Sequence, residues 1–223
     1  RCETVRPTVC LQCGGAKFKN LRLGVSRVRE ELEALAGTPV AEVTATTPDD
    51  DPGMRDARVL VGTEAVLHRV PRADAVAFLD FDQELLAVRM RTAEEALALV
   101  ARAGRVVARG SGDRGNVLIQ TRTPDHPALK AAASGDPARL VEAELPMRQA
   151  LNLPPTTALA LVSGASAPAF MERFGKPDGL LVQGPVDERW RIVAPDHQRL
   201  CDALAEVARP PGRLRVSVDP LRA

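Results

Sequence analysis

The sequence has 223 residues, a formal net charge of +1 and 45% apolar residues. This composition allows a buried core and excludes a global electrostatic attraction to nucleic acid. Aromatic residues make up only 3%, with no tyrosine and one tryptophan, so we expect a core of Leu, Val and Ala. Base stacking on aromatic rings is excluded as the main mode of nucleic-acid binding. Because no run of about 18 apolar residues occurs, we expect no membrane partner. The first residue is Arg1, from which we expect the C-terminal part of a longer protein.

The cysteines near the start of the chain suggest a metal site. Cys10 and Cys13 form a CxxC pair followed by two glycines, a tight turn typical of zinc knuckles, and Cys2 precedes the pair. We predict a partial zinc-binding segment at residues 1–17 with Cys2, Cys10 and Cys13 as ligands; a CxxC pair without metal is the alternative. Cys201 is expected to be a small buried residue on an apolar helix face. The spacing is not that of a disulfide framework, which favours a cytoplasmic location.

Short apolar segments alternate with helical segments over residues 18–123. Strands are predicted at residues 18–25, 39–45, 57–61, 75–79 and 115–120. One helix is expected to start behind a Ser26 cap and to end at Gly37, and another to cover residues 93–102 behind a Thr92 cap. This alternation predicts a parallel sheet with helices on both faces.

A different organisation begins at Pro124. A proline-bearing turn is followed by a helical segment as far as Leu151, so residues 124–155 are predicted to connect two domains. Residues 156–223 are predicted to form a small α+β domain. Its strands are expected at residues 159–162, 180–182, 189–193 and 213–218, with a helix at 196–207.

An ordered series of short motifs runs through the whole chain. It consists of CLQCGG (10–15), VLVGT (59–63), LDFD (79–82), RTAE (91–94), AGR (103–105), VLIQT (117–121), PDHP (124–127), EL (144–145), Arg148, LPP (153–155), GP (184–185) and VDP (218–220). In this order the motifs resemble the C-terminal half of the PriA family of primosomal replication-restart proteins, DNA helicases of superfamily 2. The resemblance implies an α/β fold: a RecA-like second helicase lobe at residues 18–123 with a partial zinc ribbon, then a small α+β DNA- or partner-binding domain at 156–223.

The same resemblance implies partners and cofactors. Proteins of this family recognise stalled replication forks and load the replisome. Forked or single-stranded DNA, the single-strand-binding protein and primosome or helicase-loading proteins are therefore the expected partners. Zinc is the expected cofactor, and ATP is a ligand to test in the full-length protein.

The motor motifs depart from the family pattern. Ala98 and Ala101 stand where the family has a glutamine and a glycine before its paired arginines, and Glu64 replaces another glutamine. Arg102 and Arg105 remain as degenerate nucleotide-binding candidates, because arginines near a helix end can reach a phosphate; surface charges at a helix C-terminus are the alternative. No residue is assigned a catalytic role. No Gly-rich loop with Lys-Ser or Lys-Thr occurs, so we expect this chain alone to be inactive as an ATPase.

Positive charge gathers in the last predicted domain. Trp190, Arg191, Arg199 and Arg215 are the candidate DNA-binding residues, with arginines for phosphates and the indole for a base; ordinary solvated arginines are the alternative. The main hypothesis is a replication-restart protein that binds stalled-fork DNA and recruits primosome proteins, with ATP-driven unwinding weak or lost. The alternatives are an active ATP-dependent 3′–5′ DNA helicase and a protein–protein adaptor without direct DNA binding.

Overall fold

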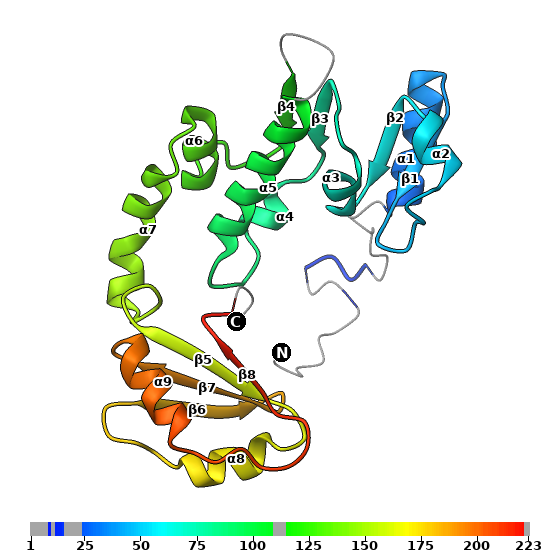
Figure 1. Cartoon of the computed structure of the whole chain (residues 1–223). Coiled ribbons are helices and arrows are strands. Elements are labelled where there is room, and N and C mark those ends of the chain that lie inside the picture. The colour runs from blue at the N-terminus through cyan, green and yellow to red at the C-terminus, as the bar shows by residue number, and fades with distance from the viewer. Residues whose placement is uncertain (1–8, 10–11, 16–23, 109–114, 221–223) are drawn as a thin grey trace. The chain divides into compact units, whose positions relative to one another are not determined.

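A computed structural model of the chain describes residues 9, 12–15, 24–108 and 115–220 (Figure 1). The chain divides into two compact units, Arg1–Ala73 and Asp74–Ala223. The described part is a mixed α/β protein with two short parallel strand pairs and one four-stranded antiparallel sheet. The finer domain bounds that the sequence suggests stay predictions.

The first unit is built around one parallel strand pair. Its elements are α1 (Val25–Ala36), β1 (Val40–Val43), α2 (Pro52–Asp56), β2 (Val59–Gly62) and α3 (Ala65–Arg69). The strands pair in parallel with Val43 opposite Gly62, where an added Cβ would lie 1.8 Å from the carbonyl oxygen of Val43. Only glycine permits this approach. Both strands confirm the sequence prediction.

The start of α1 differs from the prediction. The helix begins at Val25 behind Gly24, so Ser26 lies inside the first turn and the Ser26 cap is wrong. The helix ends at Gly37 in the left-handed conformation, as predicted. Most of the strand predicted at residues 18–25 lies outside the described residues, and its last residue belongs to α1.

The second unit opens with another parallel pair and its helices. These are β3 (Ala75–Phe78), α4 (Asp82–Leu85), α5 (Thr92–Val107), β4 (Asn116–Ile119), α6 (Pro127–Ser134) and α7 (Ala138–Ala150). Within the described residues β3 hydrogen-bonds to β4 and β1 to β2, and each pair is parallel, as predicted. Because the two pairs belong to different compact units, a single sheet that contains both stays a prediction.

Helix α5 is longer than predicted. It continues to Val107, and Thr92 is its first residue rather than its cap. The Thr92 hydroxyl donates to the carbonyl oxygens of Ala87 and Arg89 at 2.6 and 2.8 Å, so it ties down the preceding loop instead of capping the helix. The predicted Thr92 cap is therefore wrong.

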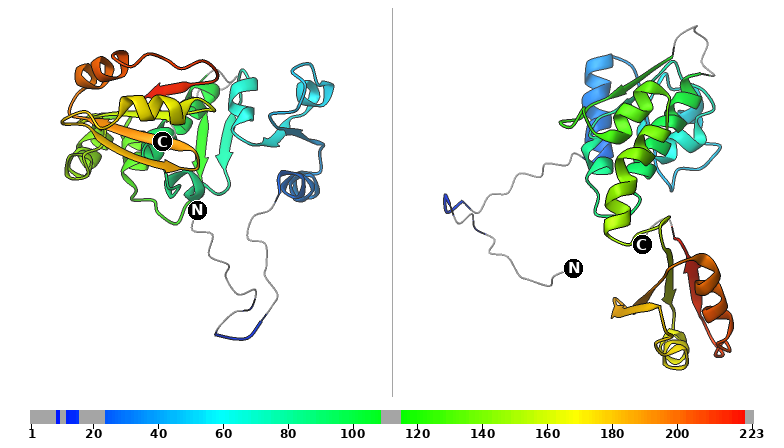
Figure 2. Two further views of the ribbon diagram at one scale, coloured as in Figure 1. Left: turned by 90° about the horizontal axis from the view of Figure 1, so that it is seen from below. Right: turned by 90° about the vertical axis from the view of Figure 1, so that its left-hand side faces the viewer.

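The rest of the second unit is an antiparallel sheet with two helices (Figures 1 and 2). Its elements are β5 (Ala158–Ser163), α8 (Ala167–Phe174), β6 (Leu181–Val186), β7 (Arg189–Ala194), α9 (His197–Ala205) and β8 (Arg215–Val218), with strand order β6-β7-β5-β8. Phe170, Phe174 and Leu200 from the two helices pack on Ala158 and Ile192 of the sheet. The core thus contains phenylalanines, which corrects the expectation of Leu, Val and Ala alone. Among the described helices none is long and apolar enough to cross a membrane.

Candidate nucleic-acid interface

The sheet of β5–β8 has two chemically different faces, because successive side chains of a strand point to opposite sides. One face carries Ala160, Val162 and Ile192 and packs on α8 and α9. The register places a second set of side chains on the opposite face: Leu159, Leu161, Ser163, Leu181, Gln183, Arg189, Arg191, Val193, Arg215 and Ser217. We call this second set the arginine face. It contains three arginines and no acidic side chain.

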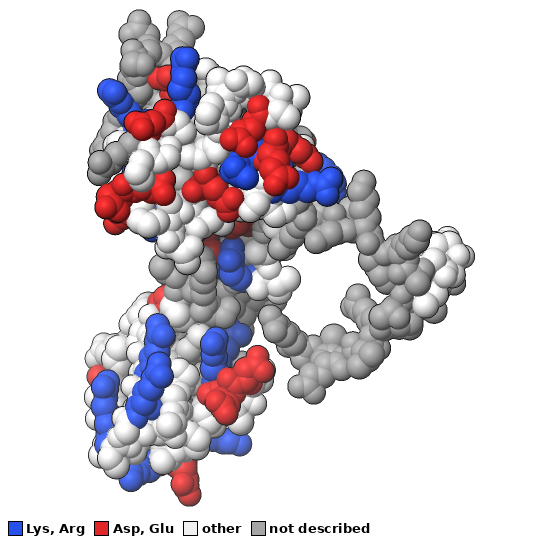
Figure 3. Space-filling model, turned by 90° about the vertical axis from the view of Figure 1, so that its right-hand side faces the viewer, with Lys and Arg blue, Asp and Glu red and all other residues white. Residues whose placement is uncertain are grey.

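The three arginines lie on the two strands that flank β5, with Arg189 and Arg191 on β7 and Arg215 on β8. Arg189 on β7 and Arg215 on β8 both pair with Ser163 of the intervening strand β5, and Arg191 pairs with Leu161 of the same strand. Two strand spacings separate Arg189 from Arg215, about 9–10 Å. Both of these arginines are exposed, and Arg191 is half-buried. Figure 3 shows Lys and Arg side chains gathered on the part of the molecule formed by residues 156–223.

The structure brings together only two of the four residues predicted to bind DNA. Arg191 and Arg215 share the arginine face, whereas Trp190 packs against the core cluster on the other face. Arg199 lies on α9, where its guanidinium donates to the carbonyl oxygen of Asp178 at 3.3 Å. The sequence alone could have predicted this difference, because Trp190 lies between Arg189 and Arg191 on one strand and must point to the opposite face of the sheet. Arg189 completes the face and was not among the predicted site residues.

A buried ion cluster supports the loop beside this face. Arg148, only 5% exposed, donates to the carboxylates of Glu94 and Glu144, each at 2.6 Å. The same guanidinium donates to the carbonyl oxygens of Met90 at 3.4 Å and Pro154 at 3.1 Å. Arg148 therefore joins α5, α7, the loop before α5 and the segment that enters β5. Arg148 belongs to the motif series, and the sequence alone indicates no role for it.

Asp82 makes a second polar cluster, at the end of β4. Its carboxylate accepts the Thr121 hydroxyl and, at 3.1 Å, the backbone N–H of Arg122. The Thr121 hydrogen bond is the main cause that lowers the pKa of Asp82 below its ordinary value, and the Arg122 N–H adds to it. The neighbouring Asp80 instead accepts from the side chain of Gln83. The two carboxylates serve separate partners and do not form an acid–base pair.

The nucleotide-binding candidates lie in the second half of α5. Arg102 is half-buried and Arg105 is exposed, and the helix continues past both to Val107. Residues 109–114, which follow, lie outside the described residues. Positive side chains near the C-terminal end of a helix fit both interpretations, degenerate nucleotide binding and ordinary surface charges.

The predicted metal ligands fall mostly outside the described part of the chain. Cys2 and Cys10 are not described, and Cys13 is exposed with a free thiol. No group of three or more His, Cys, Asp or Glu able to hold a metal occurs among the described residues. Zinc therefore stays a prediction. Cys201 is exposed, so the expectation of a buried cysteine is wrong: it lies on the outer side of α9, while Leu200 faces the core.

Comparison with known proteins identifies relatives of this chain. It is 33% identical over 182 residues to a probable replication restart protein PriA of Mycobacterium leprae, covering 80% of this chain and 28% of the relative. It is 38% identical over 103 residues to PriA of Treponema pallidum, covering 44% and 15% respectively. To PriA of Haemophilus influenzae it is 28% identical over 173 residues, covering 70% and 23%. The chain thus spans less than a third of the length of these relatives. No family model matches the chain.

Proposed function

This chain is a PriA-like protein, and we propose that it serves replication restart by binding the DNA of stalled forks through its arginine face. The observation that carries this proposal is the placement of Arg189, Arg191 and Arg215 on one sheet face without an acidic neighbour in the strands. Phosphate contacts of this kind position a protein on DNA and depend little on sequence. Such contacts suit a protein that must bind forks of any sequence.

The motor activity is proposed to be weak or lost. Arg102 and Arg105 are retained, but Ala98, Ala101 and Glu64 replace the family residues around the nucleotide. Misplacement of a catalytic group by ~1 Å can cost ~100-fold in rate. The remaining parts then serve as a scaffold that recruits primosome proteins and the single-strand-binding protein in the cytoplasm, with zinc held by Cys2, Cys10 and Cys13. An active helicase remains the second candidate because both arginines are present.

Fork binding by this chain tests the DNA-binding part of the proposal. Fluorescence anisotropy with a labelled fork is measured for the wild type, Arg189→Gln, Arg215→Gln and the control Arg173→Gln. Arg173 lies on α8, away from the arginine face, and donates to the carbonyl oxygen of Ala208. Each variant on the face should weaken binding by about three- to tenfold, and the control should bind like the wild type. Equal affinity of all four proteins would contradict the proposal.

ATPase activity separates a degenerate motor from an active one. The assay needs the full-length protein on forked DNA, beside a variant in its nucleotide-binding lobe. An active helicase would hydrolyse ATP faster than that variant, and the substitution Arg105→Ala would abolish this activity. Fork binding without turnover is the result expected for a scaffold. Binding of partner proteins without any DNA affinity, insensitive to salt, would favour the adaptor.

A further inference from the structure

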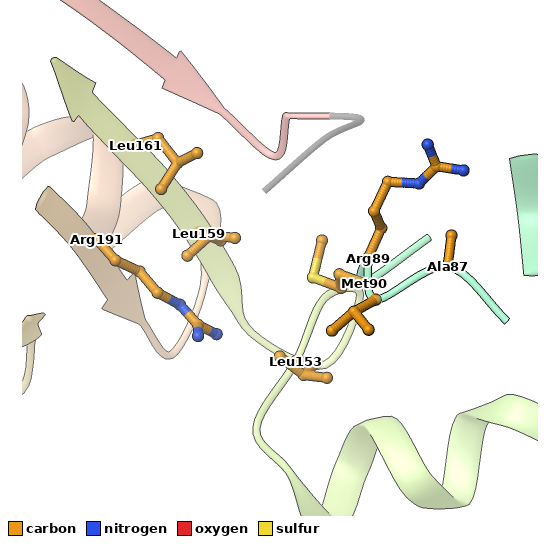
Figure 4. Close-up of a pocket in the computed structure, with 8 residues that line it drawn as sticks. Ala87, Arg89, Met90, Leu153, Leu159, Leu161 and Arg191 are labelled. Atoms are coloured by element: carbon orange, nitrogen blue, oxygen red, sulfur yellow. The ribbon is translucent and has the colours of Figure 1, made fainter. Parts of the chain in front are cut away.

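A cavity of about 370 Å³ lies against one end of the arginine face (Figure 4). Its walls are Leu159 and Leu161 of β5, Arg191 of β7, Leu153, and the loop at residues 87–90. Most of these side chains are apolar, and Met90 adds a polarizable thioether. The volume lies within the ~300–1,000 Å³ typical of small-ligand sites.

Arg191 is the cation that this cavity offers to a ligand. Its Nε is buried and has no hydrogen-bond partner among the described residues, which is a costly state for a charged group. The Nε of the other lining arginine, Arg89, is likewise buried without a partner among the described residues. The charge of Arg89 is however already paired, with Glu84 at 3.3 Å and Glu95 at 3.0 Å. In Figure 4 the Arg89 guanidinium points away from Arg191, which extends toward Leu153. A ligand with one anionic group beside an apolar group would satisfy Arg191.

The neighbouring charges indicate what kind of ligand this is. Arg189 lies on the same strand as Arg191, and Arg215 lies on the same sheet face. The side chains of Arg189 and Arg215 are both exposed. A single small anion would use only Arg191, whereas a polymer with repeating anions would use all three arginines. Single-stranded nucleic acid has this chemistry, because each phosphate carries an unpaired base that can enter an apolar pocket.

We propose that the cavity takes one nucleotide of a single DNA strand, with its base against Leu161 and Met90 and its phosphate on Arg191. This inference rests on the proposed DNA-binding function and adds a base-dependent contact to it. The strand then continues over Arg189 and Arg215, which hold further phosphates. The contact is tolerant of sequence, since the wall is apolar and every base has an apolar face.

The test compares a short single strand with the same strand carrying abasic sites at every position. The phosphate charge is the same in both, so the ratio of the two affinities isolates the contribution of the bases. Anisotropy is measured for the wild type, Met90→Ala, Arg191→Gln and Arg215→Gln. Thermal unfolding of each variant checks that it is folded. A photoreactive base in the normal strand, followed by peptide mapping, provides a measurement that needs no variant.

Because a base buries apolar surface against the cavity wall, the wild type should bind the normal strand about tenfold more tightly than the abasic strand. Met90→Ala should lower this ratio toward one, Arg191→Gln should lower both the affinity and the ratio, and Arg215→Gln should lower the affinity alone. The photoreactive base should attach to the loop at residues 87–90 or to β5. Equal binding of both strands, or attachment elsewhere, overturns the inference. If Arg189→Gln and Arg215→Gln still weaken fork binding in that case, the proposed function stands.

Competition identifies another occupant of the cavity. An apolar peptide with a free terminal carboxylate is added to the wild type and to Arg191→Gln, without DNA. Tight peptide binding that depends on Arg191, together with equal affinity for normal and abasic strands, would assign the cavity to a protein partner and overturn the inference. Weak peptide binding with a tenfold preference for bases is the result expected here.

Discussion

Asp219 and Leu159 are joined by two reciprocal hydrogen bonds. The backbone N–H of Asp219 donates to the carbonyl oxygen of Leu159 at 2.7 Å, and the Asp219 carboxylate accepts the N–H of Leu159 at 2.9 Å. The other carboxylate oxygen lies 2.6 Å from Nε2 of His197 on α9. Asp219 therefore fastens the end of β8 to the start of β5, at one end of the sheet that carries the arginine face.

Substitution of Asp219 tests this fastening. Its φ is +42°, a conformation that Asn tolerates and Ala does not. We expect Asp219→Ala to lower the free energy of unfolding by about 2–3 kcal/mol, because it leaves the Leu159 N–H unpaired and strains the backbone. Asp219→Asn should cost less than about 1 kcal/mol, since its amide oxygen still accepts from Leu159. Equal losses for the two variants in urea titrations would contradict this role.

His197 provides the matching control. Its side chain is 58% exposed, so its pair with Asp219 is strongly screened. His197→Ala should change the free energy of unfolding by about 0–1 kcal/mol. If His197→Ala lowered the free energy of unfolding more than Asp219→Ala does, the contact of Asp219 with α9 would matter more than its contact with β5, which would contradict this account.

Arg148 is expected to be the most sensitive charged residue of the second unit. Its removal takes the cation from the carboxylate of Glu144, which is 18% exposed, whereas Glu94 keeps Arg91 at 3.7 Å. It also frees the carbonyl oxygens of Met90 and Pro154. We expect Arg148→Ala to cost about 3–5 kcal/mol in the free energy of unfolding. Arg139→Ala, on the same helix and 60% exposed, should change it by about 0.5 kcal/mol or less. Similar unfolding midpoints for the two variants in urea would contradict this difference.

Asp82 should make stability depend on pH in the acid range. Its pKa in the folded protein is lowered, so the charged form is the one that the fold stabilises. The contribution is fully present above the ordinary pKa of an aspartate and is lost as the pH falls through the lowered pKa. Asp82→Asn should therefore flatten the loss of stability below about pH 4. Thr121→Val removes the main cause and should act in the same direction; an unchanged acid profile of both variants in thermal unfolding would contradict the assignment.

The zinc prediction can be tested by metal analysis of the full-length protein. Cys10→Ser and Cys13→Ser should each lower the zinc content, because a tetrahedral site does not survive the loss of a thiolate ligand. Cys201→Ser is the control, since Cys201 is an exposed free thiol on α9. Zinc content unaffected by Cys13→Ser would remove this residue from the ligand set.

Local patterns predicted the described strands but not all of the described helices. Alternating or continuous apolar residues located every described strand, including β5 and β7, to within a few residues. Helix α8 was missed because Pro168 and a short apolar run obscured its periodicity, yet Phe170 and Phe174 form part of the core. Helix starts were wrong at Ser26 and Thr92, because these good capping residues are the second residue of α1 and the first residue of α5.

The candidate site was only partly predictable for a different reason. Arg191 and Arg215 were grouped because positive charge gathers in this part of the sequence, but a count of charges does not distinguish the two faces of a sheet. Trp190 was grouped with them although strand alternation turns it to the core. The cavity that Arg191 lines is completed by Leu153 and the loop at residues 87–90, which are distant in sequence from β7. The spacing of residues along the sequence does not show which distant segments meet in the folded protein.

The salt dependence of fork binding tests the central claim most directly. We would measure the dissociation constant of this chain for forked DNA across a range of salt concentrations, for the wild type and for Arg189→Gln/Arg215→Gln. Each phosphate contact contributes about 0.7–0.9 to the log–log slope. The double variant should therefore have a slope about 1.4–1.8 smaller than the wild type. An identical slope for the two proteins would contradict DNA binding through the arginine face.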